Sequence, residues 1–177
     1  SIGRAVASRV AAFGVRVVAT VGRASPPLAE PPLDWIGSGM ADLERLLRQS
    51  DFVLLACPLT TQTKEMIGEP QLACMQPHAV LINVARGPVV NEAALFSALK
   101  NERIGGAILD VWWRMPDVAK RRKTCSPFGP NHPFHTLPNV IMSPHTSGWT
   151  VGQQQRTLEQ VADNLTRLAD GQGLCNV

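Results

Sequence analysis

The segment 79–88 constrains the fold more than any other part of the chain. Its apolar residues run almost without interruption as far as Ala85, and the run then stops at Arg86–Pro88. A short apolar run that is bounded by proline and glycine is typical of a strand buried on both faces of a parallel sheet. We therefore expect a buried parallel strand here, and with it an α/β fold.

Arg86 comes directly after this strand, at the carboxyl end, where open α/β sheets bind their ligands. Packing does not explain an arginine at such a position. A guanidinium, however, pairs with a carboxylate through two parallel hydrogen bonds. Two interpretations stay open on this residue alone: an arginine that binds a carboxylate ligand, or one that caps the strand and pairs with a local acid.

Helices and strands alternate on both sides of this segment, which is the pattern of a doubly wound sheet. The expected fold class is α/β, with a Rossmann-like doubly wound parallel sheet. Gly14 is expected to end the first helix, and Asn91 to cap the helix after segment 79–88. Segments 22–39 and 117–138 are expected to be loops, the second one irregular and at the surface. The other predicted strands cover 15–21, 52–56, 104–109 and 140–142, and the predicted helices cover 1–13, 41–49, 71–75, 91–101 and 151–169.

The composition is that of an ordinary globular protein and limits the expected partners. Of 177 residues, 45% are hydrophobic and 18% are charged, and the net charge is +3. Apart from Lys120–Lys123 no basic face is evident, so we expect no nucleic-acid partner. No apolar run approaches the roughly 20 residues of a membrane-spanning helix, and the first residues lack the order of a signal peptide. We therefore expect no membrane partner and a cytoplasmic location.

The cysteines Cys57, Cys74, Cys125 and Cys175 form no C-x-x-C pair. Scattered cysteines in a chain of this size indicate reduced thiols rather than a disulfide framework. A zinc site made from Cys125, His132 and His135 is conceivable, but it lacks a fourth ligand at a suitable spacing. We therefore expect no bound metal.

Several predicted strands end in residues that packing does not require. The carboxyl ends of parallel strands share one edge of a sheet, so these residues should lie along one crevice. His145 alone could be an ordinary packed or surface histidine. A histidine that shares an edge with Arg86 can exchange a proton while the arginine holds a carboxylate, which suits redox chemistry at the adjacent carbon. The strand-end residues are Gly22-Arg23, Cys57-Pro58, Asn83 with Arg86, Asp110, and Ser143-Pro144-His145.

The first residues favour a nucleotide ligand. Ser1-Ile2-Gly3 opens a predicted helix that precedes a strand, as the end of a G-x-G-x-x-G turn would. Backbone amides of such a turn hold a pyrophosphate at the helix N-terminus. The feature is weak by itself, because glycine is common near helix starts.

These residues together resemble the nucleotide-binding domain of the D-isomer-specific 2-hydroxyacid dehydrogenases. The resemblance spans nearly the whole chain, with the motifs in the family's order. The matching motifs are Ser1-Ile2-Gly3, Cys57-Pro58-Leu59 followed by Thr63, 81–87, 106–111, 137–140 running into Ser143-Pro144-His145, Asn164-Leu165, and 174–177.

The resemblance implies an oxidoreductase of the EC 1.1.1 type, which transfers a hydride between NAD(P)H and a small 2-oxo acid or D-2-hydroxy acid. Arg86 would bind the substrate carboxylate and polarise the 2-oxo group. His145 would be the general acid for reduction and the base for oxidation. Family members are usually dimers, so a homodimer is expected for the full-length protein. The implied cofactor-binding residues are Ser1, Ile2, Cys57, Pro58, Val84, Arg86, Asp110 and His145, with Gly148 leaving room beside His145.

The chain departs from the family pattern at its start. Compared with the family, the first strand of the sheet and the upstream substrate domain are missing, so we expect a fragment that is inactive alone. Residues 1–150 would form the NAD(P)-binding domain, truncated at its N-terminus. Residues 151–177 would form the last helix and the return to the missing substrate domain.

A second departure lies at Met115, where the family places a glutamate that hydrogen-bonds the catalytic histidine. We expect a weaker or relocated partner for His145, with Asp117 as the nearest candidate. The same departure leaves open a non-catalytic, corepressor-like binding protein. Enzymes of the family that act on formate or phosphite are a further alternative. Trp112-Trp113 could shape a substrate pocket, form a dimer contact or simply pack.

The cofactor expectation depends on the end of the second predicted strand. NAD-specific members end this strand with an acid that binds the ribose hydroxyls. Here Thr20-Val21-Gly22-Arg23 contains no acid, and Arg23, with Arg4 nearby, could meet a 2′-phosphate instead. NADP is therefore favoured over NAD, with a plain surface arginine as the alternative for Arg23.

Overall fold

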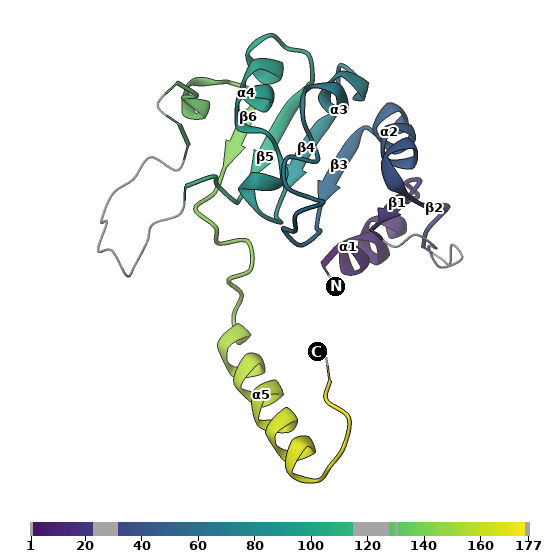
Figure 1. Ribbon diagram of the computed structural model, residues 1–177, viewed down its shortest axis with the longest axis vertical. Helices are drawn as coiled ribbons and strands as arrows, with labels where there is room; N and C mark the ends of the chain where they lie inside the picture. Colours follow the sequence, from purple (N-terminus) through teal and green to yellow (C-terminus); the bar gives the residue numbers. More distant parts are fainter. Residues whose placement is uncertain (1, 23–31, 115–127, 130, 176–177) are drawn as a thin grey trace. The chain divides into compact units, whose positions relative to one another are not determined.

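The fold is taken from a computed structural model, which describes residues 2–22, 32–114, 128–129 and 131–175 of the 177-residue chain (Figure 1). The chain divides into two compact units, residues 1–145 and residues 146–177. Each unit is described by itself. The division lies a few residues before the expected domain boundary at residue 150, which stays a prediction.

The first unit contains a four-stranded parallel sheet in the order β3-β4-β5-β6 (Figure 1). Its register aligns the last residues of the strands: Leu55 pairs with Asn83, Asn83 with Leu109, and Leu109 with Met142. The four carboxyl ends therefore lie on one line, as the sequence predicted. The strands are β3 (Phe52–Leu55), β4 (Val80–Asn83), β5 (Gly106–Leu109) and β6 (Val140–Met142).

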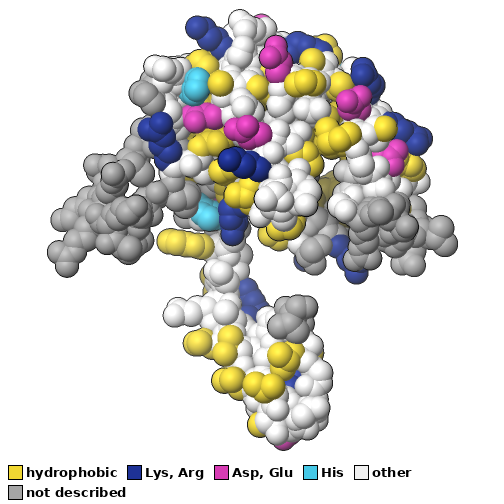
Figure 2. All heavy atoms as spheres, in the orientation of Figure 1, with side chains coloured by type: hydrophobic (Ala, Val, Ile, Leu, Met, Phe, Trp, Pro, Cys, Tyr) yellow, Lys and Arg dark blue, Asp and Glu magenta, His cyan; other side chains and the backbone are white. Residues whose placement is uncertain are grey.

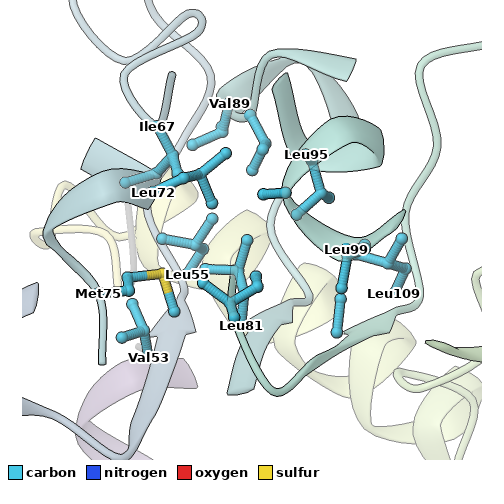
Figure 3. Packing of buried hydrophobic residues seen from close by; sticks show 14 of the residues in the cluster. Val53, Leu55, Ile67, Leu72, Met75, Leu81, Val89, Leu95, Leu99 and Leu109 are labelled. Carbon is cyan, nitrogen blue, oxygen red and sulfur yellow. The ribbon is translucent and has the colours of Figure 1, made fainter. Parts of the chain in front are cut away.

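One face of this sheet forms the core of the first unit. Leu81 of β4 and Leu109 of β5 are fully buried, and they belong to one cluster with leucines of the three helices α2, α3 and α4. Leu46, Leu72 and Leu95 are such leucines, one from each helix. Figure 3 shows part of this cluster, including Leu72 of α3 and Leu95 of α4. The helices cover α2 (Gly39–Gln49), α3 (Glu69–Cys74) and α4 (Glu92–Lys100).

The expectation that the segment 79–88 is buried on both faces was wrong in part. Leu81 and Asn83 point to the core and are buried, whereas Val80 and Ile82 point to the other face and are half-buried. At the outer strands this second face is open, since Ile141 of β6 is exposed. Within the described residues, the helices that form the core lie against one face of the sheet.

The first unit also contains a second, two-stranded parallel sheet that the sequence did not predict. Strand β1 (Val18–Val21) pairs with β2 (Trp35–Ser38), which lies inside the segment 22–39 that was expected to be a loop. Asp34 fixes the register: its backbone N–H donates to Val17 O at 2.8 Å, and its Oδ2 accepts from Val17 N at 2.7 Å. Proline and glycine around β2 hid the strand, because these residues are typical of loops.

Two predicted helix signals are confirmed. Gly14 has a left-handed backbone (φ 71°), and it ends the helical segment formed by α1 (Ile2–Val10) and the short 3-10 helix η1 (Ala11–Phe13). Asn91 caps α4, because its Oδ1 accepts a 2.9 Å hydrogen bond from Ala94 N.

The described end of segment 117–138 differs from the surface loop that was expected. Phe134, in the 3-10 helix η3 (Phe134–Thr136), is fully buried, and Phe128 is buried too. Phe134 stacks on Trp113 at a centroid distance of 5.2 Å and meets Phe96 edge-on at 5.3 Å. These aromatic contacts fix a segment whose polar and proline-rich surroundings indicated a loop. Residues 115–127 and 130, which include Met115, Asp117 and Lys120–Lys123, lie outside the described residues.

The second unit consists mainly of helix α5 (Gln153–Ala169). Leu158, Val161, Leu165 and Leu168 recur at helical spacing and are all exposed, and hydrophobic side chains are visible along this helix in Figure 2. Asn164 ties the end of the chain to α5, since its side chain accepts from Cys175 N at 2.8 Å and donates to Cys175 O at 3.0 Å. Among the described helices, none has the length and apolar composition that crossing a bilayer requires.

Candidate active site

The candidate site is the line of carboxyl ends in the four-stranded sheet. Arg86 follows β4 and His145 follows β6, with β5 and its extension at Asp110 between them. Cys57 follows β3 on the other side of β4. The structure therefore brings four of the predicted site positions to one sheet edge.

The turn that carries Arg86 is shaped by the side chain of Asn83. Asn83 is only 1% exposed, its Oδ1 accepts from Ala85 N at 3.0 Å, and its Nδ2 donates to Arg86 O at 3.1 Å. An asparagine supplies both a donor and an acceptor, so one buried side chain satisfies two backbone groups of the turn. The Arg86 side chain is exposed, and its Nη1 donates to Ala85 O at 2.7 Å.

The segment that carries His145 is attached to β5. Ser143 N donates to Leu109 O at 3.0 Å, and Ser143 Oγ donates to Asp110 Oδ1 at 2.6 Å. His145 is half-buried and has a left-handed backbone (φ 59°), which costs a residue other than glycine about 1–2 kcal/mol. The anchored residues before His145 hold it in this uncommon conformation.

Asp110 lies between the Arg86 turn and the His145 segment. It is 3% exposed, its backbone N–H donates to Asn83 O at 3.1 Å, and its carboxylate accepts from Ser143. A buried carboxylate requires such hydrogen bonds to offset the loss of water. Asp110 therefore links the ends of β4, β5 and β6.

A threonine pair orders the loop after β3. Thr60 N donates to Thr63 Oγ1 at 2.8 Å, and Thr63 Oγ1 donates to Pro58 O at 2.6 Å. Pro58 is exposed and Cys57 is half-buried. Burial raises the pKa of the Cys57 thiol above its ordinary value, and a backbone hydrogen bond offsets this only in part. Cys57 is consequently a neutral thiol near pH 7.

The start of α1 lies beside the end of β3. A Cβ built on Gly3 would lie 3.6 Å from the Cβ of Ala56, which precedes Cys57. The first turn of α1 contains no acidic side chain. Backbone N–H groups at a helix N-terminus attract anions, so the start of α1 suits the phosphates of a dinucleotide.

The comparisons with known proteins agree with this geometry. The family model for the D-isomer specific 2-hydroxyacid dehydrogenase, NAD binding domain, matches residues 1–147. The chain belongs to this family. The predicted fold class, an α/β Rossmann-like parallel sheet, is thereby confirmed together with the resemblance to the family.

Individual relatives cover the chain almost completely. The glyoxylate reductase of Thermococcus gammatolerans is 41% identical over 171 residues, which are 97% of this chain and 46% of that protein. An NAD-complexed D-isomer specific 2-hydroxyacid dehydrogenase from Lactobacillus delbrueckii ssp. bulgaricus superposes with a TM-score of 0.76 at 28% identity, over 97% of this chain and 51% of that one. A D-isomer specific 2-hydroxyacid dehydrogenase from Xanthobacter autotrophicus Py2, in complex with NADPH and MES, superposes with a TM-score of 0.78 at 30% identity. The superposition covers 98% of this chain and 64% of that one. The chain spans about half the length of the curated relatives it matches.

The described structure does not place some of the predicted site residues at the carboxyl edge of the four-stranded sheet. Ser1 and Arg23 lie outside the described residues. Gly148 is exposed in the second unit, whose placement relative to His145 is not defined. By contrast, Val84 is half-buried in the turn between β4 and Arg86, and Ile2 opens α1, whose start lies beside the end of β3.

The structural roles of two residues at the edge were not predicted. Asn83 was expected among the strand-end residues of the crevice but not as the residue that shapes the turn, although an asparagine after an apolar strand is a recognisable turn signal. Trp112 was considered for a pocket, a dimer contact or packing, yet its Nε1 donates to Ser143 O at 3.0 Å. No pattern in the sequence indicates that hydrogen bond.

The described residues contain no group of three or more His, Cys, Asp or Glu side chains that is suited to a metal ion. His132 Nδ1 lies 3.3 Å from Glu92 Oε1. Cys125, the other residue considered for zinc besides His132 and His135, lies outside the described residues.

Proposed function

We propose that this chain forms the NAD(P)-binding part of an oxidoreductase that transfers a hydride between NAD(P)H and a small 2-oxo acid or D-2-hydroxy acid. The observation that supports the proposal most directly is the shared sheet edge, where a permanently charged Arg86 and a half-buried His145 flank the extension of β5. The position of α1 beside the end of β3 adds an anion-binding helix terminus to the same edge.

The two side chains have complementary roles in this proposal. The guanidinium of Arg86 pairs with the substrate carboxylate and polarises the adjacent 2-oxo group. His145 donates a proton to the 2-oxo oxygen during reduction, and the same nitrogen takes the proton from the 2-hydroxyl group during oxidation. The nicotinamide of the bound cofactor supplies the hydride for reduction and accepts it in oxidation. Reduction thus adds one hydride to the carbon and one proton to the oxygen.

The proposed cofactor contacts follow the edge. The backbone of Ser1 and Ile2 would hold the pyrophosphate. The nicotinamide half would lie against the ends of the strands. The residues proposed for this half are Cys57, Pro58, Val84, Arg86, Asp110 and His145.

We favour NADPH over NADH because the segment 20–23 contains no acid for the ribose hydroxyls, whereas Arg23 can pair with a 2′-phosphate. Structures with NAD and with NADPH both occur among the similar proteins. A comparison of kcat/KM for the two cofactors tests this preference. Arg23→Ser is expected to lower the ratio of kcat/KM for NADPH to kcat/KM for NADH. A clear preference of the wild type for NADH would contradict it.

The substrate class is proposed from the names of the relatives. Several of them are glyoxylate reductases, which favours a small 2-oxo acid. The test is a panel of glyoxylate, hydroxypyruvate and pyruvate with each cofactor, using the full-length gene product that contains this sequence. NADPH oxidation with at least one of these acids supports the proposal.

We expect no turnover by the 177-residue chain alone, and we expect the full-length protein to be a cytoplasmic homodimer.

A second candidate is a non-catalytic, corepressor-like binding protein. Met115, at the position where a glutamate was expected, favours it. Turnover of a 2-oxo acid by the wild type separates the two candidates. In an active protein, Met115→Glu then tests whether His145 works with a weaker or relocated partner: a carboxylate partner favours the imidazolium form, so the histidine-dependent limb of the pH–rate profile should move to higher pH. Tight cofactor binding without turnover of any 2-oxo acid would instead favour the binding protein.

A further inference from the structure

Trp112 contacts both turns of the candidate site. Its Nε1 donates a 3.0 Å hydrogen bond to the carbonyl of Ser143, two residues before His145. Its own backbone packs on Gly87, directly after Arg86, so closely that a Cβ on Gly87 would overlap the Trp112 carbonyl. We propose that Trp112 is a positioning residue that fixes the His145 segment relative to the Arg86 turn. The catalytic meaning of this role rests on the function proposed above.

The indole completes a three-point attachment of Ser143 to β5 and its extension. The backbone N–H of Ser143 donates to Leu109, its hydroxyl donates to Asp110, and its carbonyl accepts from Trp112. The next residue, Pro144, restricts Ser143 to extended conformations, so a fixed Ser143 carbonyl also fixes the direction in which the chain leaves toward His145.

The donor itself is held rigidly. Trp112 is 6% exposed, and its ring meets the buried ring of Phe128 edge-on at a centroid distance of 5.8 Å. The backbone of Trp112 also packs against Gly87, at a position where any side chain on residue 87 would overlap the Trp112 carbonyl. A displacement of Trp112 is therefore transmitted to the Arg86 turn as well as to the His145 segment.

Trp113 provides a matched control. Its Nε1 also donates to a backbone carbonyl, that of Val90, at 2.7 Å, and its ring also packs on a buried phenylalanine, Phe134. Val90 follows the 3-10 helix η2 (Gly87–Val89) and leads into α4, whereas Ser143 leads to His145. Trp112→Phe and Trp113→Phe each remove one indole donor and keep an aromatic ring. Trp112→Phe frees the Ser143 carbonyl, whereas Trp113→Phe frees the Val90 carbonyl.

The first measurement is steady-state kinetics of the full-length gene product with NADPH and glyoxylate. Trp112→Phe is expected to lower kcat about 10-fold to 100-fold, because small displacements of catalytic groups have effects of this size. The dissociation constant for NADPH should change much less than kcat, because the proposed contacts at Ser1, Ile2, Cys57 and Pro58 do not depend on Trp112. Trp113→Phe should leave kcat much closer to the wild-type value.

The second measurement needs no activity. The ¹H–¹³C NMR signal of the His145 ring, assigned with His145→Gln, should shift and broaden in Trp112→Phe and stay unchanged in Trp113→Phe. If Trp112→Phe fails to fold, 3-benzothienylalanine at residue 112 replaces it, because this analogue keeps the shape of tryptophan and lacks the N–H donor.

The outcomes separate this inference from the proposed function. Equal effects of the two substitutions on kcat and on the His145 signal would overturn the positioning role, because Trp112 would then act through stability alone. A wild type that turns over no 2-oxo acid would refute the proposed function. In that case the His145 signal still decides whether Trp112 positions the segment.

Discussion

The hydroxyl of Ser143 donates a 2.6 Å hydrogen bond to Oδ1 of Asp110, a carboxylate that is almost completely buried. This bond joins the end of β6 to the end of β5, and Asp110 N in turn donates to Asn83 O at the end of β4. The residues that precede Arg86 and His145 are therefore parts of one hydrogen-bonded edge. That connection is the structural basis for considering the two side chains together.

Ser143→Ala should destabilise the protein by about 1–3 kcal/mol, because it removes a hydrogen-bond donor from a buried carboxylate. Urea unfolding of the full-length gene product measures the loss. Ser8→Ala is the control: the exposed Ser8 hydroxyl donates to Arg4 O, and its removal should change stability by less than about 0.5 kcal/mol. Equal stabilities of the two variants would show that the Ser143–Asp110 bond contributes nothing.

Asn83→Asp should weaken substrate binding more than cofactor binding. The aspartate keeps the acceptor for Ala85 N and loses the donor to Arg86 O, so the Arg86 turn loses one of its two side-chain bonds. The KM for the 2-oxo acid should rise about tenfold, which corresponds to one lost hydrogen bond. Asn101→Asp, at the exposed end of α4, serves as the control, and the prediction fails if both variants keep the wild-type KM.

Leu81→Ala should cost about 2–5 kcal/mol, as expected for a large apolar side chain in a core. Its neighbour Ile82 points to the half-buried face of the same strand, so Ile82→Ala should cost clearly less. Chemical denaturation of both variants compares the two faces of β4 directly. Equal losses would mean that the second face is buried as well.

Cys57 should react slowly with iodoacetamide near neutral pH. Burial raises the pKa of its thiol, so the reactive thiolate forms only as the pH rises above the ordinary value of 9.0. Mass spectrometry of the Cys57 peptide across a pH series measures the alkylation rate, with the Cys175 peptide as an internal reference. A rate midpoint at or below pH 9.0 would contradict the raised pKa.

The sequence predicted the parts of the fold that depend on local signals. The strand Val140–Met142, the Asn91 cap and the Gly14 stop agree with the structure, because apolar runs and capping residues act over a few neighbours. The shared edge of Arg86 and His145 also followed, since parallel strands with a common register place their ends together.

The remaining features depend on contacts between distant segments. β2 pairs with β1 through the contacts of Asp34 with Val17, which nothing in a proline-rich segment indicates. Phe134 is buried because other aromatic rings surround it, although its neighbours in the sequence are polar. The hydrogen bond from Trp112 to Ser143 spans 31 residues of sequence, and no local pattern predicts it.

The proposed role of His145 in hydride transfer is tested by the turnover of the full-length gene product and of its His145→Gln variant, with His78→Gln as the control. His78 is an exposed histidine that pairs with Asp51 at 2.7 Å, just ahead of the strand β4. The wild type and His78→Gln should oxidise NADPH with a small 2-oxo acid. His145→Gln should be slower by a factor of about 10²–10⁴ and should still bind the cofactor, because His145 is one of several proposed contacts. Undiminished turnover in His145→Gln would refute the role of His145 in catalysis.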